Sequence, residues 1–278
     1  MKQKEFYRKV FSLVIPMALQ NLINVGVSAT DVVMLGKVSE QVLSGCSLGG
    51  QVFFIFNLFL FGMASGVSVL TAQYWGKRDT DSIEKLLGIV MRLAVIAGLI
   101  FMLGSFFFPQ QIMHVFTDEP EIIAEGVKYL RIVAFTYPMV ALSMTYLNLI
   151  RSIEKVLIST VVYGLSMVLN FVVNGILIFG LFGAPRLGIV GAAIGTLLAR
   201  ALELAIMLFY AYFRNDVIRL RLSFFLHTDR GLARDFLRYS SPVVINEFLW
   251  GAGYSAIAAI IGHQGSSAVA ANSVAQVM

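Results

Sequence analysis

Two acidic residues, Asp31 and Glu247, stand inside long apolar stretches of the sequence, and neither stretch contains a basic residue. An ionised carboxylate in hydrocarbon costs about 3 kcal/mol or more, so an acid found there usually faces a cavity and handles an ion or a substrate. A carboxyl group in such a cavity can alternate between protonated and cation-bound forms. We therefore expect Asp31 and Glu247 to serve proton or sodium coupling. The alternative is that each acid pairs with a neighbouring helix and only orders the bundle.

Polar side chains accompany these acids at helical spacing. On the first apolar stretch they are Gln20, Asn24, Ser28 and Asp31, and on the fifth they are Ser166, Asn170 and Asn174. Steps of three and four place each set on one helix face. Small polar groups can also simply hold helices together. A stripe that ends in a carboxylate favours a cavity, so we expect Gln20 and Asn24 to line a substrate cavity.

The fourth stretch carries a second candidate for that cavity. Tyr137 and Asn148 lie there among other polar residues, and an aromatic ring suits an organic cation through cation–π contact. Arg200 and Glu203 are three residues apart in the sixth stretch. We interpret them as a mutually neutralising pair with a mainly structural role.

The elements that carry these residues are predicted to be membrane-spanning helices. The chain is 58% hydrophobic and 13% charged, and apolar stretches of about 20 residues can cross a bilayer as helices. They lie at 10–35, 46–74, 87–108, 127–149, 157–181, 189–213 and 240–262, and an eighth begins near 267. We therefore predict an all-α membrane protein.

The basic residues indicate the orientation. They concentrate in the loops on one side of the predicted spans, whereas the other side has Lys37, Lys128, Arg131 and Arg186. Cytoplasmic loops carry the excess of Lys and Arg. We expect a multi-pass protein of the cell membrane with a cytoplasmic amino terminus, and we do not interpret the net charge of +5 as a sign of nucleic-acid binding.

Enzymatic chemistry finds no support in the sequence. Cys46 is the only cysteine, the three histidines are scattered, and no Ser/His/Asp grouping, metal-ligand spacing or phosphate loop is present. We expect no enzyme activity, no cofactor and no metal site, apart from transient Na⁺ at Asp31 or Glu247.

An internal repeat organises the chain. A shift of 226 residues aligns Pro16 with Pro242, Gly36 with Gly262 and Ser47 with Ser273. Because six spans separate the copies, both enter from the same side, as in parallel transporter repeats. We predict a six-helix lobe at 1–213, a cytoplasmic linker at 214–239 and the start of a second lobe at 240–278. Truncation is the simplest account of the missing remainder.

Three segments resemble the multidrug and toxic compound extrusion (MATE) transporters. They are IPMALQNLINVGVSATDVVMLG at 15–36, LNFVVNGILIFGLFGAPRLGIVGAAIGTLLAR at 169–200 and SPVVINEFLWGAG at 241–253. The resemblance implies two six-helix lobes and alternating access driven by protons or Na⁺. It implies that Asp31, with Asn170 and Thr196, forms the cation site of the first lobe and that Glu247 serves the second. At Asn174 one branch of the family has a second Asp, which makes Glu247 the stronger coupling candidate.

The resemblance thus implies an antiporter that exports organic cations or drugs through the bilayer in exchange for Na⁺ or H⁺. A related flippase of lipid-linked oligosaccharides is the first alternative. It is less favoured because binding pyrophosphate needs a cationic cavity, and Arg200 is the only base in the middle of a predicted span. A membrane receptor is the second alternative. A fragment of this length is not expected to transport alone, because it lacks the carboxy-terminal half of the lobe pair.

Overall fold

The computed structural model describes residues 3–215, 217–218 and 229–276. Its elements are α1 (Gln3–Gly36), α2 (Glu40–Gly76), α3 (Thr80–Phe107), α4 (Pro109–Phe116), α5 (Pro120–Val133), α6 (Thr136–Ser152), α7 (Leu157–Phe179), η1 (Leu181–Gly183), α8 (Ile189–Phe213), α10 (Arg230–Gly262) and α11 (Ser266–Ala275). Six of these helices are long and apolar enough to cross a membrane, or seven spans result if α5 and α6 count as one. The predicted all-α, multi-pass membrane fold is confirmed.

The fourth predicted span is a broken helix and not the continuous one expected over 127–149. α5 and α6 meet at a bend of 53°. Pro138 has no N–H to donate to the carbonyl of Ala134, and its ring crowds that carbonyl, so the helix cannot continue through this turn. The hydroxyl of Thr136 instead donates to the Val133 carbonyl at 2.7 Å, which satisfies one backbone group freed by the break.

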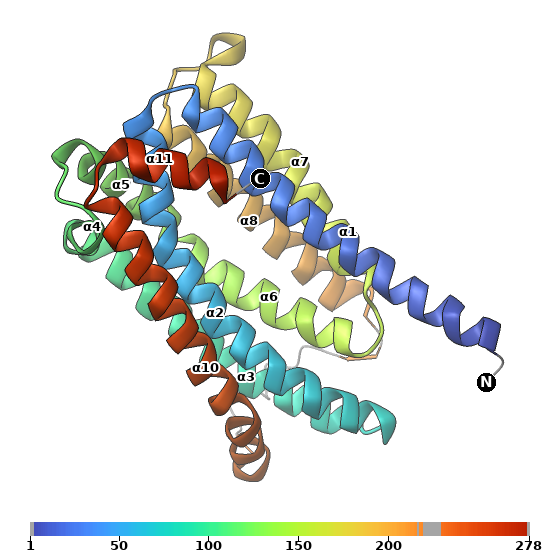
Figure 1. Ribbon diagram of the computed structural model, residues 1–278. Helices are drawn as coiled ribbons and strands as arrows, with labels where there is room; N and C mark the ends of the chain where they lie inside the picture. Colours follow the sequence, from blue (N-terminus) through green and yellow to red (C-terminus); the bar gives the residue numbers. More distant parts are fainter. Residues whose placement is uncertain (1–2, 216, 219–228, 277–278) are drawn as a thin grey trace.

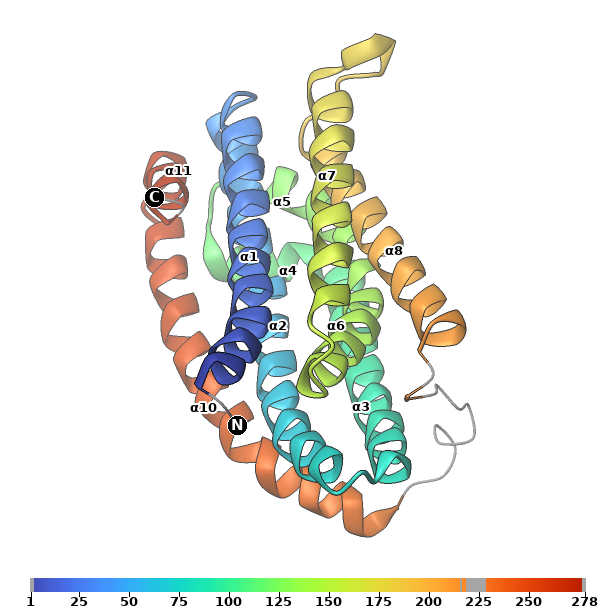
Figure 2. The same cartoon turned by 90° about the vertical axis from the view of Figure 1, so that its right-hand side faces the viewer.

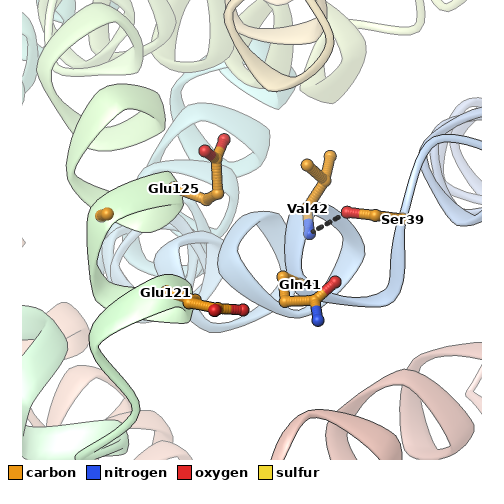
Figure 3. Close-up of a pocket in the computed structure, with 6 residues that line it drawn as sticks. Ser39, Gln41, Val42, Glu121 and Glu125 are labelled. Carbon is orange, nitrogen blue, oxygen red and sulfur yellow. Dashed lines mark hydrogen bonds between the residues drawn. The ribbon is translucent and has the colours of Figure 1, made fainter.

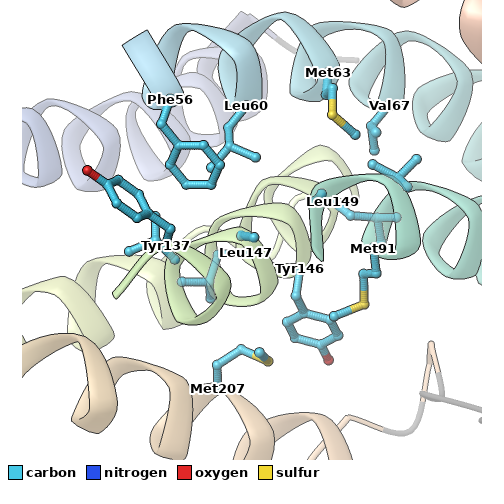
Figure 4. Close-up of a cluster of buried hydrophobic side chains, with 14 of the residues drawn as sticks. Phe56, Leu60, Met63, Val67, Met91, Tyr137, Tyr146, Leu147, Leu149 and Met207 are labelled. Atoms are coloured by element: carbon cyan, nitrogen blue, oxygen red, sulfur yellow. The ribbon is translucent and has the colours of Figure 1, made fainter. Parts of the chain in front are cut away.

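The helices form two neighbouring groups. α1 packs mainly against α7, and α7 packs against α8, whereas α2 is the central helix that contacts α3, α5, α6 and α10 (Figure 1). Figure 4 shows the apolar core, where Phe56 of α2 lies beside Tyr137 of α6, Tyr146 of α6 lies beside Met91 of α3, and Met207 reaches the same cluster from α8. This core fixes the position of α8 relative to α6.

Glycines allow α10 to lie directly on α2. A Cβ added at Gly62 would come within 2.7 Å of the Val244 Cα, and one added at Gly66 would lie 3.1 Å from the Ser240 Cα. Such backbone approach requires residues without side chains, as in other membrane helix pairs. The α2–α10 contact therefore joins the first lobe to the predicted start of the second.

The repeat seen in the sequence is matched by the helix boundaries. α1 ends at Gly36 and α10 at Gly262, while α2 begins at Glu40 and α11 at Ser266, so both pairs keep the same shift. Ser47 and Ser273 are equivalent under this shift, and the Ser273 hydroxyl donates a hydrogen bond of 2.7 Å to the Ser47 hydroxyl. In the predicted parallel repeat, this contact would place both residues beside the axis that relates the two copies.

The loops predicted to be cytoplasmic gather at one end of the bundle. Figure 2 shows the α2–α3 turn, the α6–α7 turn and the start of α10 at the bottom, opposite the α1–α2 and α10–α11 turns. The α2–α3 turn holds Lys77 and Arg78, and Asp79 there caps α3. Hydrogen bonds from Ser82 hold the pKa of Asp79 below its usual value.

The seventh span begins earlier than predicted. Asp229 accepts hydrogen bonds from the backbone N–H groups of Gly231 and Leu232, so α10 starts at Arg230 and runs unbroken past Pro242. Its first turns run beneath the ends of α2 and α3 (Figure 2), with Leu232 and Phe236 buried.

Candidate functional site

Asp31 meets the amide stripe of α7. The Asn174 Nδ2 donates to the Asp31 Oδ1 at 2.7 Å and to the Asn170 Oδ1 at 3.2 Å. Asn170 and Asn174 are four residues apart, so both lie on the α7 face that packs against α1. The side chains of Asn170 and Asn174 are buried, with 4% and 0% exposed. We refer to Asp31, Asn170 and Asn174 as the Asp31 cluster.

One oxygen of the Asp31 cluster has no hydrogen-bond donor. Among the described residues, the Asn174 Oδ1 is buried and has no partner. A buried polar atom without a partner carries a desolvation cost, so such an atom calls for an explanation. Carboxylate and amide oxygens are the ligands that hard cations prefer. The Asp31 carboxylate and this unsatisfied oxygen are thus the kinds of ligand that suit a small cation.

α8 approaches the Asp31 cluster at Gly195. A Cβ built on Gly195 would lie 1.9 Å from the Asn174 Oδ1. Thr196 follows on the same helix and is partly buried, and the described part of the chain shows no hydrogen bond between it and the cluster. The glycine is therefore the residue that lets α8 close over Asn174. It belongs to the run GIVGAAIGT at 188–196, whose glycines favour close helix contact.

Gly195→Ala is expected to displace the Asn174 side chain and separate its amide from Asp31. Substitutions that disturb the residues orienting an ion's ligands typically cost about 10-fold to 100-fold in ion affinity. We expect the lower end of that range, measured as the ion concentration for half-maximal transport by the full-length protein. Gly175→Ala is the matched control, because a Cβ there meets no atom within 4 Å. Equal behaviour of the two variants would contradict the role given to Gly195.

The expected cavity residues of α1 lie further along that helix. The Gln20 side chain is buried, and its Oε1 accepts a hydrogen bond of 3.3 Å from the Ser159 hydroxyl. Thr160 donates to the Pro16 carbonyl at 3.1 Å. These bonds fix α1 to the start of α7. The side chain of Asn24 lies outside the part of the chain that the structure describes.

Tyr137 and Asn148 are not brought together. Tyr137 is fully buried, and its ring centroid lies 5.2 Å from that of Phe56 in an edge-to-face contact. Asn148 accepts a hydrogen bond from Arg151 near the other end of α6. Tyr137 thus packs in the lobe core, and a substrate chamber lined by these residues stays a prediction.

Glu247 lies apart from the Asp31 cluster. It is a partly exposed residue of α10, the helix that packs along α2, whereas Asp31 is held between α1 and α7. No ion pair of Glu247 is found among the described residues. The structure therefore separates the two predicted coupling acids onto different helix groups.

The predicted Arg200–Glu203 pair is confirmed. The Arg200 Nη1 lies 2.7 Å from the Glu203 Oε2, and the Glu203 side chain is fully buried. The structure adds a partner that was not predicted, because the Ser143 hydroxyl of α6 donates to the Glu203 Oε1 at 2.6 Å. Both carboxylate oxygens of Glu203 are thus occupied.

The pocket in Figure 3 is separate from the Asp31 cluster. Ser39, Gln41 and Val42 at the start of α2 line it together with Glu121 and Glu125 of α5. Glu125 pairs with Lys128 at 2.5 Å, and the Ser39 hydroxyl accepts from the Val42 backbone N–H. In the described ranges, no group of three or more His, Cys, Asp or Glu residues could hold a metal ion.

Solved structures share this arrangement. An inward-facing conformation of a multidrug resistance MATE family transporter of the MOP superfamily matches 96% of this chain and 60% of its own, with a TM-score of 0.80 and 19% identity. An outward-facing conformation of such a transporter matches with a TM-score of 0.78 and 18% identity, over 97% of this chain and 64% of its own. At these identities the similarity shows the fold.

Curated relatives and a family model identify the family of this chain. The Probable multidrug resistance protein YoeA of Bacillus subtilis is 23% identical over 96% of this chain and 58% of its own length. The Probable multidrug resistance protein NorM of Agrobacterium fabrum is 26% identical over 97% of this chain and 58% of its own length. This chain thus spans somewhat more than half of these relatives. Residues 16–176 match the family described as MatE. The chain therefore belongs to the MatE family.

Proposed function

We propose that this chain forms the first lobe and the start of the second lobe of an antiporter that exports organic cations or drugs. The Asp31 cluster is the proposed site of the coupling Na⁺ or H⁺. The observation that carries this proposal is a carboxylate held inside the bundle beside a buried amide oxygen without a donor. The names of the relatives, which are multidrug resistance proteins, support the class of substrate.

Asn170, Asn174 and Thr196 are proposed to assist Asp31, and Glu247 is proposed to serve a second cation site. Export requires that ion binding favour one of two conformations, which is possible only if the ion binds them with different affinities. We propose alternating access between two lobes as that change, and a cytoplasmic amino terminus as the orientation.

The charge of the substrate determines how much of the membrane potential one coupling ion can contribute to export. A monovalent cation that moves inward across about 100 mV releases about 2.3 kcal/mol. Moving a neutral substrate against a tenfold gradient requires about 1.4 kcal/mol. One ion per cycle can therefore sustain a gradient of a neutral drug above tenfold. A monovalent organic cation such as ethidium leaves against the same potential, which cancels the ion's about 2.3 kcal/mol, so its export is driven by the ion's own concentration gradient or by a second ion per cycle.

The test is gradient-driven transport by the full-length protein in proteoliposomes. With an imposed Na⁺ or proton gradient, ethidium is expected to move against its own gradient, and dissipating the ion gradient with an ionophore is expected to stop this movement. Uphill transport that survives the ionophore would contradict ion coupling. Export of a lipid-linked oligosaccharide in place of ethidium would favour the flippase alternative.

A further inference from the structure

Three charged side chains lie inside the first lobe near the proposed cation site. They are Asp31 on α1 and the pair formed by Arg200 and Glu203 on α8. Arg200 is five residues beyond Gly195, the point where α8 touches Asn174, which is about 7.5 Å along a helix. Arg200 is the one basic residue within α8, and it lies less than two helical turns from that contact.

In the structure, however, Arg200 forms its ion pair with Glu203. The two residues share a helix face at a spacing of three, and their charged atoms are 2.7 Å apart. Ser143 fixes the other carboxylate oxygen of Glu203, and the Arg200 guanidinium carbon lies 5.6 Å from the centre of the Phe53 ring. Ser143 and Phe53 therefore add contacts from α6 and α2 that hold the pair in place.

The charges of this group determine what it can bind. Arg200 and Glu203 neutralise each other, so the three residues together keep the single negative charge of Asp31. Since charges in a low-dielectric interior interact strongly, one monovalent cation is the partner that neutralises the group. If Arg200 no longer paired with Glu203, it could itself neutralise Asp31. The exchangeable ion would then bind Asp31 more weakly.

We propose that Glu203, oriented by Ser143, is a positioning residue that keeps Arg200 away from Asp31 and so leaves the Asp31 carboxylate free for the exchangeable cation. This goes beyond the structural role expected from the sequence. It rests on the proposed function, because it assumes that Asp31 binds the coupling ion.

The decisive variant is Glu203→Gln in the full-length protein. Glutamine keeps the shape of the side chain and an oxygen for Ser143 but no longer neutralises Arg200. We expect Arg200 to pair with Asp31 in this variant. Ion-driven ethidium transport, normalised to monodisperse protein, is then expected to fall by about tenfold or more. The reason is that a close ion pair in a low-dielectric interior is worth more than the free energy of a tenfold change in ion affinity. The double variant Arg200→Met with Glu203→Gln removes the competing cation and is expected to regain most of this loss.

A second readout separates positioning from simple loss of structure. Dicyclohexylcarbodiimide modifies protonated carboxyl groups within membranes, and mass spectrometry of peptides locates the modified residue. In the unaltered protein, Asp31 labelling is expected to fall when Na⁺ is added or the pH is raised. In Glu203→Gln, an ion pair with Arg200 keeps Asp31 ionised, so labelling is expected to be low with or without the ion.

Three outcomes discriminate the possibilities. If monodisperse Glu203→Gln keeps ion-dependent labelling of Asp31, the positioning role is wrong and the pair is structural. If Glu203→Gln gives no monodisperse protein, Ser143→Ala replaces it, because it removes only the orienting hydrogen bond. In Ser143→Ala, adding Na⁺ is expected to lower Asp31 labelling less than it does in the unaltered protein. A fall equal to that of the unaltered protein overturns the proposal. If Asp31→Asn itself leaves ion-driven transport intact, then the proposed function of Asp31 fails, and the inference about Glu203 fails with it.

Discussion

Asp31→Asn is expected to abolish ion-driven transport by the full-length protein while leaving its folding intact. Asparagine has nearly the same shape as aspartate and keeps an oxygen that can accept from the Asn174 amide, as Asp31 does now at 2.7 Å. What the substitution removes is the one negative charge that Arg200 does not already balance. Since disturbing even the orienting shell of an ion site costs about 10-fold to 100-fold, loss of the charged ligand should exceed 100-fold.

The measurement compares rates of gradient-driven ethidium transport at equal amounts of monodisperse protein. Asp81→Asn is the matched control, because it makes the same chemical change at an exposed residue that pairs with Lys85 at 2.6 Å. Transport by Asp31→Asn at the level of Asp81→Asn would remove Asp31 from the coupling site. Glu247→Gln, examined in parallel, shows whether the second acid carries coupling when the first does not.

The fold class followed from the sequence because bilayer thickness sets the length of a spanning helix. Stretches of apolar residues therefore located the spans, and the confirmed helices occupy nearly the same positions. The fourth span was predicted as one continuous helix because its hydropathy is high throughout. Hydropathy does not reveal that Pro138 lacks the backbone N–H that a continuous helix needs there. The early start of α10 was missed because its first turns are amphipathic and resemble a linker in composition.

The Asp31 cluster was predictable only in part. Helical spacing placed Asn170 and Asn174 on one face, and the lone acid drew attention to Asp31. Whether these faces meet depends on how α1 packs on α7, which no local pattern specifies. The contact at Gly195 and the bond from Ser143 to Glu203 depend in the same way on α8 approaching α7 and α6. Tyr137 shows the converse, since its ring suggested cation–π contact with a substrate, whereas that ring packs against Phe56 in the core.

A disulfide between residues 47 and 273 is expected to arrest transport. Ser47 and Ser273 are joined by a hydrogen bond of 2.7 Å, so cysteines at both positions bring two sulfur atoms close to bonding distance, which is about 2.05 Å. These residues link α2 of the first lobe to α11 of the second at the end of the bundle that holds the α10–α11 turn. If the lobes separate there in each cycle, as alternating access requires, a covalent bond prevents the separation.

The experiment uses Ser47→Cys with Ser273→Cys in a Cys46→Ser background, so that the native thiol next to Ser47 cannot pair wrongly. Oxidation is expected to stop ion-driven transport in the cross-linked fraction, and dithiothreitol is expected to restore it. The two single-cysteine proteins, treated identically, control for oxidation elsewhere in the protein. Full transport by the cross-linked protein would show that α2 and α11 stay together throughout the cycle, and the moving boundary would then have to lie elsewhere. The glycine contact of α2 with α10, where backbones touch at Gly62 and Gly66, would be the next boundary to cross-link.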